Sequence, residues 1–465
     1  MLAMMMVERA WRRLPHMQLA EGVPTMRRLG LGLAGLVGLA GLVSVFLVGV
    51  RHVAAEDGVL DRVVVRAGKS GRAAGPVHWT IELPAGALRD GTELPAVRVT
   101  SDDQRELPAQ IGGLRLSAAH QTVPDARREL TVIVSALQPG ESLRLTARWK
   151  SKDNTKESNE QRRPEFRWND TPGKSADLQF GNRPVLRYMY EKLDESSADR
   201  RADTYKPYHH VFDPTGMRLV TKGPGGLFPH HRGLFYGFNR IEYGPQRVKA
   251  DVWHCNHGEY QSHERVLIQE AGVAYGRHRV RIDWHGPDGK VFAEEDRELT
   301  AYHVDGGSMI EFRSMLASTD GKVRLDGDPQ HAGFQFRASQ EVPDKTAAQT
   351  YYLRPDGAGQ PGSFRNWDDK MRDPRTINLP WLGLCFVLGE QRYTCLYLDH
   401  PDNPKEARYS ERDYGRFGSY FEYDLEPAHP LFVNYRLWLQ AGELSPPQAE
   451  AQAEAFTRPL SVDRS

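Results

Sequence analysis

The chain has 465 residues, and its 61 lysine and arginine residues equal its 61 aspartate and glutamate residues in number, so the formal net charge at pH 7 is zero. Without a net positive field, neither a nucleic-acid partner nor a general attraction to anionic lipid is expected. Three cysteines are too few for a disulfide framework, and the length suggests two to three domains.

Residues 1–55 are predicted to be a leader that exports the protein. The segment Leu29–Val50 contains no charged residue and directly follows Arg27 and Arg28. A basic flank, an apolar run and then small residues are typical of a secretory signal, and Val53-Ala54-Ala55 predicts cleavage directly after that triplet, which would leave the protein periplasmic or secreted. Because the apolar run is long enough to span a bilayer, the alternative is an uncleaved inner-membrane anchor with a periplasmic domain. Membrane contact is expected only through this segment.

Residues 58–150 are expected to form a small N-terminal β-sandwich. Short runs alternate apolar and polar residues, and Pro/Gly turns separate the runs. Val77, Trp79 and Ile81, for example, would lie on one face of a strand. Such strands at short, regular spacing are typical of a sandwich. The segment 151–175 is charged and poor in apolar residues, so it is predicted to be a solvated linker between domains.

Residues 176–445 again alternate strand and turn patterns, and no long stretch has a convincing helical period. We therefore predict an all-β chain in which these residues form a large antiparallel β-sandwich that carries the functional site. The Ala/Glu/Gln-rich tail, residues 446–465, is expected to contain a short helix. Cys385 and Cys395 flank a predicted hairpin, so two interpretations stay open: one disulfide between them, or three reduced and partly buried thiols.

Histidines gather in the first part of the large domain, where seven of the 17 fall between residues 209 and 263. His230 and His231 follow the Gly/Pro-rich segment 223–229, which predicts a loop that runs into a strand. Neighbouring side chains on a strand point to opposite faces. Both histidines can therefore enter one pocket only if the backbone is irregular there.

Residues that could bind a metal stand together in the segment Asp251–Glu259. On a strand, however, His254 and His257 would point to opposite faces, and the chain has no second pair of ligands at the spacing of a structural zinc site. Histidines that are hydrogen-bonded within the fold or exposed at the surface are therefore expected here. We assign no metal ligands and predict no cofactor, with a divalent metal as the alternative.

Two later segments have the composition of a ligand site. His331 is expected to begin a strand on which Gly333 and Arg337 share its face, and the small glycine would leave room for a ligand. The segment 399–416 is dense in Arg, Tyr, Asp and His. Aromatic rings can stack on the apolar faces of sugars, and arginine and carboxylate groups can bind hydroxyl groups, so this composition suits sugar recognition. The alternative is a solvated charged loop.

We expect these segments to form one site. Imidazole titrates near neutrality and can move a proton, and arginine can bind a carboxylate or a developing oxyanion. The predicted catalytic residues are His230, His231, His331, Asp399 and Glu411. The predicted substrate-binding residues are His210, Arg232, Trp253, Arg337, His400, Arg412 and Tyr414. The alternative is a buried polar network that fastens long loops to the sandwich.

The same segments resemble a family of exported bacterial proteins, abundant in planctomycetes, that carries the label methane oxygenase PmoA. The matching stretches are Arg62–Gly68, Pro108–Gln110, Tyr208–Gly216, Pro229–Leu234, Asp251–Trp253, Asp328–Arg337, Arg365–Trp367 and Asp399–Phe421. That label does not fit, because the membrane subunit of that name needs many spanning helices and this chain has at most one apolar segment. The resemblance instead implies carbohydrate breakdown and a fold similar to galactose-mutarotase-type sandwiches, whose sites combine histidines with carboxylates. Many members have a Lys-Glu pair where this chain has Gln330 and His331.

Three functions are compatible with these features. The first is an exported carbohydrate-active protein that acts on a glycoside or modified sugar as a hydrolase, lyase or epimerase, through His/Arg/carboxylate acid–base chemistry. The second is a non-catalytic carbohydrate-binding or cell-surface interaction protein, and the third is a metal-dependent oxidase. In the first two, the partner is a small-molecule or polymeric carbohydrate. The sequence predicts no oligomeric state.

Overall fold

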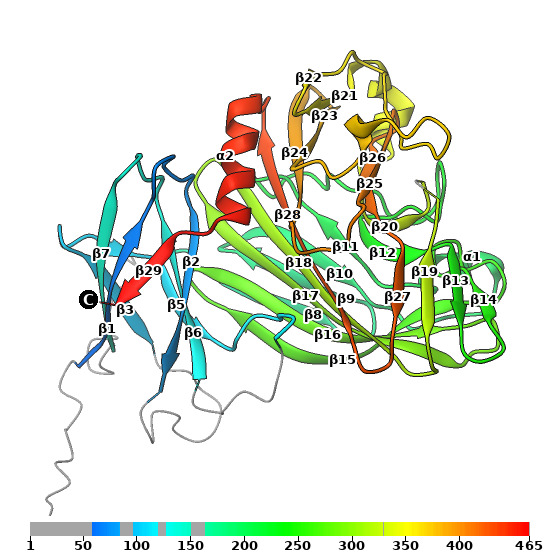
Figure 1. The fold of residues 1–465 in the computed structure, drawn as a ribbon, viewed down its shortest axis with the longest axis horizontal. Helices are drawn as coiled ribbons and strands as arrows, with labels where there is room; N and C mark the ends of the chain where they lie inside the picture. The colour runs from blue at the N-terminus through cyan, green and yellow to red at the C-terminus, as the bar shows by residue number, and fades with distance from the viewer. Residues whose placement is uncertain (1–57, 84–95, 120–126, 150–162, 329, 465) are drawn as a thin grey trace, which may run out of the picture. The chain divides into compact units, whose positions relative to one another are not determined.

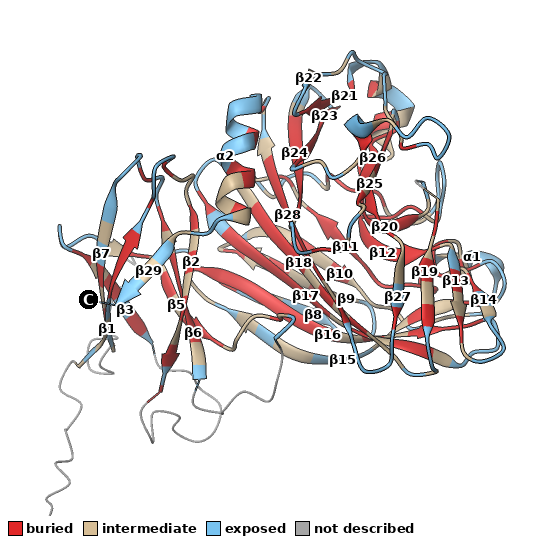
Figure 2. Ribbon diagram, viewed as in Figure 1, coloured by how far each residue is buried: buried red, intermediate tan, exposed pale blue. Residues whose placement is uncertain are grey.

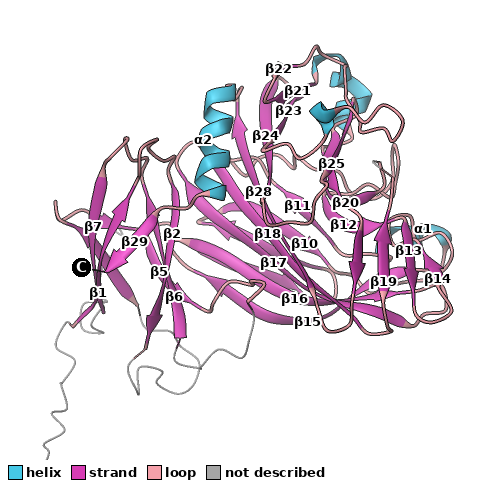
Figure 3. Ribbon diagram, viewed as in Figure 1, coloured by secondary structure: helices cyan, strands magenta, loops and turns pink. Residues whose placement is uncertain are grey.

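The computed structural model describes residues 58–83, 96–119, 127–149, 163–328 and 330–464. The predicted export segment, residues 29–50, lies outside them. The described chain consists mainly of antiparallel strands with few helices, which confirms the all-β prediction (Figure 3). None of the helices in this part of the chain is long and apolar enough to cross a membrane.

The N-terminal sandwich is built from two small sheets, with the strand orders β29-β1-β7-β3-β4 and β2-β6-β5. Their strands are β1 (Val59–Arg66), β2 (Gly75–Glu82), β3 (Val97–Ser101), β4 (Glu106–Leu107), β5 (Ala109–Gly112), β6 (Arg127–Val134), β7 (Ser142–Trp149) and β29 (Ser461–Arg464). In β2, Val77, Trp79 and Ile81 are buried and alternate with partly exposed residues, as the sequence predicted. Apolar residues from both sheets form one core, so the small sandwich is confirmed.

The last strand of this sandwich comes from the C-terminal tail of the chain. β29 pairs antiparallel with β1, with Val462 opposite Val65 (Figure 1). It follows α2 (Pro446–Thr457), which is the short helix expected in the tail. Ser445 and Gln448 form a capping box that satisfies the first backbone N–H groups of this helix. The tail is therefore a structural part of the N-terminal sandwich.

The large sandwich contains an eight-stranded sheet, with the order β25-β26-β20-β12-β11-β10-β9-β8, and a nine-stranded sheet, with the order β15-β16-β17-β18-β28-β24-β23-β21-β22. The strands of the first sheet are β8 (Phe166–Thr171), β9 (Ser175–Phe180), β10 (Arg183–Met189), β11 (Tyr208–Val211), β12 (Leu234–Phe238), β20 (Ala332–Arg337), β25 (Arg408–Arg412) and β26 (Arg416–Tyr420). The strands of the second sheet are β15 (Tyr260–Ala271), β16 (Tyr275–His285), β17 (Val291–Val304), β18 (Gly307–Ser318), β21 (Tyr351–Arg354), β22 (Gly357–Ala358), β23 (Leu382–Leu388), β24 (Gln391–Asp399) and β28 (Leu431–Ala441).

Aromatic residues join these two sheets. Phe334 of β20 stacks on Phe312 of β18, with ring centroids 4.1 Å apart, and on Tyr435 of β28 at 5.0 Å. All three belong to one large core, and β28 is buried along most of its length (Figure 2). The large antiparallel sandwich is therefore confirmed.

A four-stranded sheet and several short helices complete the described fold. The strands of that sheet, in the order β14-β13-β19-β27, are β14 (Val248–Ala250), β13 (Arg240–Tyr243), β19 (Val323–Asp326) and β27 (Tyr423–Leu425). The remaining helices are α1 (Ala198–Thr204), η4 (Val342–Thr346), η5 (Ala347–Gln349) and η6 (Pro374–Thr376).

The segment predicted as a linker, residues 151–175, is partly a strand. Residues 150–162 lie outside the described chain, but β8 pairs with β9 along its whole length. Phe166 is buried, and the indole N–H of Trp168 donates to the carbonyl oxygen of Glu270 at 3.0 Å. The linker prediction was wrong for β8 because this edge strand is anchored by two aromatic residues while its other side chains are exposed.

The hairpin β23–β24 excludes a disulfide between Cys385 and Cys395. Cys385 lies opposite Thr394, and Cys395 lies opposite Leu384, so the two cysteine side chains point to opposite faces of the sheet. All three cysteines are free and buried. The interpretation with three reduced thiols is therefore the correct one.

Candidate functional site

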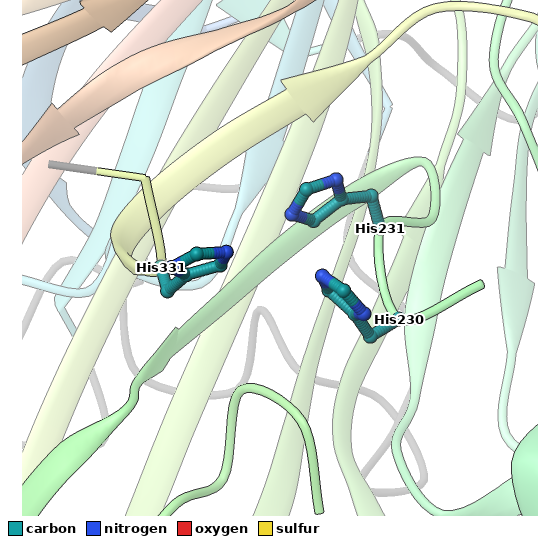
Figure 4. Close-up of side chains that lie close together, drawn as sticks. All are labelled: His230, His231 and His331. Carbon is teal, nitrogen blue, oxygen red and sulfur yellow. The ribbon is translucent and has the colours of Figure 1, made fainter. Parts of the chain in front are cut away.

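Four histidines from three separate segments of the chain meet at one place. His230 and His231 lie in the loop before β12, His254 lies in the turn after β14, and His331 directly precedes β20. The ring centroid of His230 lies 4.2 Å from the centroid of His231 and 4.5 Å from the centroid of His254. The centroids of His254 and His331 are 4.7 Å apart. Figure 4 shows His230, His231 and His331 with a nitrogen of each ring turned toward the space between them. We call these four residues the histidine cluster.

An irregular loop lets both His230 and His231 enter the cluster. The loop contains no strand between residues 223 and 233, and Phe228 has a φ of +54°, a backbone conformation that non-glycine residues rarely adopt. Lys222 holds the loop closed, because its ammonium group donates to the carbonyl oxygens of Gly223, Phe228 and His231 at 3.1, 3.3 and 3.2 Å. The backbone is therefore irregular at His230 and His231, which is the condition under which both side chains were expected to be able to enter one pocket.

Two members of the cluster are each oriented by an aspartate three residues earlier in the chain. Nδ1 of His254 is 2.7 Å from a carboxylate oxygen of Asp251, and Nδ1 of His331 is 2.8 Å from one of Asp328. Since a carboxylate can only accept, each Nδ1 carries a proton, and in the neutral form of each ring Nε2 then has a free lone pair. Burial alone would raise the pKa of Asp328, but the hydrogen bond and charge of His331, together with hydrogen bonds from the Gln330 backbone and the Asn239 amide, outweigh burial and hold the pKa below its ordinary value.

The other two histidines are neutral and have unused nitrogen atoms. Burial lowers the pKa of His230 to about 2, and the charge of Lys206 contributes to this. Burial, and after it the charge of Arg416, lowers the pKa of His231 well below its ordinary value. Nε2 of His230 and both ring nitrogens of His231 are buried and have no hydrogen-bond partner within the described residues. These atoms can therefore bind a ligand.

Two fully buried arginines lie close to His231 and have no carboxylate partner in the described part of the chain. Arg337 donates to the carbonyl oxygens of Ala338 and Tyr414. Arg416 donates to the side-chain oxygens of Gln335, at 3.1 Å, and Ser410, at 3.0 Å. Nε and Nη2 of Arg337 and Nε of Arg416 have no acceptor there, and burial lowers the pKa of Arg337 to about 10. Unpaired buried cations of this kind favour an anionic ligand.

Aromatic side chains border the cluster on two sides. The ring of Tyr414 is nearly parallel to that of His231 at 6.1 Å and is 4.9 Å from the ring of Phe228. Phe228 is 41% exposed, which is unusual for a large apolar side chain and leaves surface for a ligand. On the other side, Trp253 is fully buried and lies 5.7 Å from His231 and 4.6 Å from Phe235.

The structure brings part of the predicted site together. The predicted residues in or beside the cluster are His230, His231, His331, Trp253, Arg337 and Tyr414. Arg412 lies further out, with its guanidinium carbon 5.5 Å from the ring centroid of the exposed Phe364, and its charge interacts with Arg416 and Tyr414.

Asp399 and His400 do not belong to this site. The Asp399 carboxylate is buried and accepts hydrogen bonds from Asn403 at 2.8 Å and from Ser419 at 2.9 Å, so it orients no histidine. His400 packs edge-on against Phe456 of α2, with ring centroids 5.2 Å apart. These predictions were wrong because this polar segment mainly satisfies its own loops.

Glu411 also serves the fold. It is buried, forms a paired hydrogen-bonded ion pair with Arg354, and accepts the backbone N–H of Arg365 at 2.7 Å. Both of its oxygen atoms are therefore engaged within the fold, and the structure does not bring this carboxylate into the histidine cluster.

Arg232 and His210 are structural as well. Arg232 donates to the carbonyl oxygens of Asp203 at 3.1 Å and Ala202 at 2.6 Å, so it ties α1 to the histidine loop. Both ring nitrogens of His210 are used, by Thr221 at 3.1 Å and by Tyr208 at 3.3 Å. A polar network that fastens loops accounts for these hydrogen bonds, while Nε of Arg232 has no hydrogen-bond partner within the described residues.

Four residues at the cluster were not predicted from the sequence: His254, Asp251, Asp328 and Lys206. Residues 251–259 were expected to be extended, whereas residues 252–254 form a turn that folds His254 back onto Asp251. The usable signal was a repeated spacing, because Asp-x-x-His occurs both at Asp251–His254 and at Asp328–His331. Lys206 is buried, donates to the carbonyl oxygen of Trp253, and lies over the Trp253 ring at 5.8 Å.

Parts of this chain are similar to known proteins. The model of a family described as "Family of unknown function (DUF6807)" matches residues 175–454, which include the entire histidine cluster. No curated protein matches the chain. Two solved structures from Enterococcus faecalis, a protein in glycosyl hydrolase family 38 and an alpha-mannosidase, are similar to it with TM-scores of 0.44 and 0.45 and 9% sequence identity. They cover 87% and 88% of this chain, which itself spans 47% of the length of each.

Proposed function

We propose that this chain, which belongs to the DUF6807 family because the family model covers more than half of it, is a carbohydrate lyase or epimerase. Its substrate would be a sugar that has a carboxylate or carbonyl group. The observation that carries the proposal is the position of two Asp–His pairs beside two buried arginines that have no counter-ion. A base and an anion-binding group side by side are what the removal of a proton next to a carbonyl requires.

A hydrolase with two free carboxylates fits this site less well. Glycosidases usually need one carboxyl group as acid and a second as nucleophile or base. Asp251 accepts from the backbone N–H groups of Trp253 and His254 and from the His254 ring. Asp328 accepts from the backbone N–H of Gln330, from the Asn239 amide and from the His331 ring. Neither carboxylate is therefore available to a glycosidic bond.

In the proposed reaction, His254 is the general base. Its Nε2 takes the proton from carbon, and Asp251 stabilises the imidazolium that forms by accepting the hydrogen bond from Nδ1. The negative charge then develops on the carbonyl or carboxylate oxygen of the sugar. The buried N–H groups of Arg337 and Arg416 that have no acceptor within the described residues would donate to such an oxygen.

The aromatic border supports a sugar as the substrate. The exposed ring of Phe228 and the adjacent ring of Tyr414 give an apolar surface for one face of a pyranose. The family resemblance implies the same substrate class.

The test is proton exchange between substrate carbon and solvent. The full chain is incubated in D₂O with a panel of uronic acids, keto sugars and their glycosides, and deuterium incorporation or an alkene product is followed by NMR. We expect exchange with at least one substrate and a loss of about 10²–10⁴-fold in His254→Gln. His257→Gln is the matched control, because His257 lies in the same segment with 77% of its side chain exposed. Binding without exchange or product would identify a non-catalytic carbohydrate-binding protein, and full activity of His254→Gln would exclude His254 as the base.

A further inference from the structure

His230, His231 and His331 together offer more ring nitrogens for binding a ligand than a proton transfer requires. One ring nitrogen from each lies within 4.8 Å of the other two. Nε2 of His230 and both nitrogens of His231 are buried without a hydrogen-bond partner in the described residues. A buried polar atom without a partner costs about 1–3 kcal/mol. A neutral imidazole has one N–H and one lone pair, so the unpartnered nitrogens of His230 and His231 call for a ligand that accepts one lone pair from each ring.

We propose that these three histidines bind one divalent transition-metal ion. Three imidazoles with an open position on the ion are a common ligand set of catalytic zinc sites. The ligand nitrogens of a tetrahedral zinc ion lie about 3.3 Å apart, so small rotations of the three rings bring them into range. Burial already keeps His230 and His231 neutral, which is the form that binds a metal.

Asp328 supports this assignment. Metal-binding histidines usually donate their second ring N–H to a carboxylate or carbonyl, which fixes the ring and increases its basicity. His331 donates from Nδ1 to Asp328, whose carboxylate is itself held by the amide of Asn239 at 2.8 Å. The lone pair of His331 Nε2 is therefore held in a defined direction, as a ligand atom requires.

The chemistry of the ligands selects the class of ion. Imidazole suits zinc, copper, nickel, cobalt and iron, whereas Mg²⁺ and Ca²⁺ prefer oxygen. The two nearest carboxylates, Asp251 and Asp328, already accept hydrogen bonds from histidines and are better placed to balance the charge of the ion than to bind it. The charges of Arg337 and Arg416 near His231 favour an anion, such as hydroxide or a substrate carboxylate, at the open position of the ion.

A second group of potential ligands, Glu264, Asp283 and His285, does not have these properties. Nδ1 of His285 is 3.0 Å from the carbonyl oxygen of Gly289, and its Nε2 is 2.8 Å from the hydroxyl of Ser262. Both ring nitrogens are thus engaged, and no lone pair is free.

The metal site does not depend on the proposed function. His254 is outside the three-histidine group, so its Nε2 stays available as a base when the ion is bound.

Zinc titration of the chelator-treated full chain tests the proposal, with no sugar present. We expect one Zn²⁺ per chain by calorimetry, and Co²⁺ should give the visible absorption of a tetrahedral nitrogen site. His331→Ala should weaken Zn²⁺ binding by more than about 100-fold and Asp328→Asn by about 10–100-fold. The control His257→Ala should bind as the wild type does, because that side chain is exposed and lies outside the group.

Two results would overturn the proposal: a wild-type chain that binds less than one Zn²⁺, or His331→Ala with wild-type affinity. Circular dichroism checks the fold of each variant. If His331→Ala does not fold, Asp328→Asn is the deciding variant, because it keeps the His331 ring and the volume of the side chain at position 328. Unchanged Zn²⁺ affinity in Asp328→Asn also counts against the site. The sugar assay is separate, so a failure of one experiment is not a failure of the other.

Discussion

Asp251 accepts a hydrogen bond from Nδ1 of His254 at 2.7 Å, and its second carboxylate oxygen accepts the backbone N–H groups of Trp253 and His254. The aspartate therefore fixes both the turn and the orientation of the ring. We predict that Asp251→Asn lowers kcat by about 10²–10⁴-fold with little change in Tm. The reason is that an amide oxygen can still accept the two backbone hydrogen bonds but cannot stabilise a charged imidazole.

The measurement is deuterium exchange together with a melting curve. Asp402→Asn is the control, since Asp402 lies 3.6 Å from His400, outside the cluster, with 86% of its side chain exposed. A large fall in Tm without a specific loss of kcat would show that Asp251 only holds the turn.

Arg337 should contribute to binding at the expense of stability. It is fully buried, has no carboxylate partner within the described chain, and has two N–H-bearing nitrogens without acceptors. Removing an unpaired buried charge is often neutral or stabilising. We predict that Arg337→Met raises KM for acidic sugars by at least about 10-fold, while Tm is unchanged or higher. Loss of affinity for neutral and acidic sugars alike would contradict the assignment of an anion-binding role.

The β-strands of the fold were predictable because the alternation of apolar and polar residues that identifies a strand involves only neighbouring residues. The alternation at Val77, Trp79 and Ile81 and the absence of a helical period identify strands and sandwiches from neighbouring residues alone. The strand pairs that sequence cannot predict are those set by long-range register. β29 returning to β1 is an example.

The candidate site was only partly predictable, because polar residues of the same type serve different purposes in it. Within the described residues Arg337 lacks a carboxylate partner and Arg354 has one, yet only the fold reveals that Glu411 reaches Arg354. Gly333 was expected to leave room for a ligand, but a Cβ there would lie 2.0 Å from the carbonyl oxygen of Ser419, so that space belongs to the backbone of β26. The Asp-x-x-His spacing was the local signal that could have found His254.

Glu411, unlike Arg337, is a buried charged residue with an oppositely charged partner. Its carboxylate binds the buried guanidinium of Arg354 through two hydrogen bonds and also accepts the backbone N–H of Arg365. Removing one partner leaves a buried charge unpaired, which costs about 3–5 kcal/mol. We predict that Glu411→Gln lowers the free energy of unfolding by this amount, measured by urea denaturation, while the folded fraction keeps its KM. A changed KM with normal stability would show that Glu411 takes part in substrate binding.

Lys206 should make stability depend on pH in the alkaline range. It is buried against Tyr205, Phe235 and Trp253, and burial lowers its pKa to about 7 from the ordinary value of 10.5. Between these two values the unfolded chain keeps the proton and the folded chain loses it, so the unfolded state binds more protons and stability rises with pH. Below about pH 7 both states are protonated, and the full cost of burying the charge is present.

The variant Lys206→Met removes this titration while it keeps most of the side-chain volume. We predict that the Tm of the wild type, relative to that of Lys206→Met, increases as the pH rises from 7 to 10. Taking the difference between the two proteins cancels the groups that titrate in both. Glu390→Gln, an exposed change in the β23–β24 turn, is the control and should give a flat difference. A flat difference for Lys206→Met as well would mean that Lys206 stays protonated in the folded chain, with the Trp253 carbonyl and the surrounding rings sufficient to hold the charge.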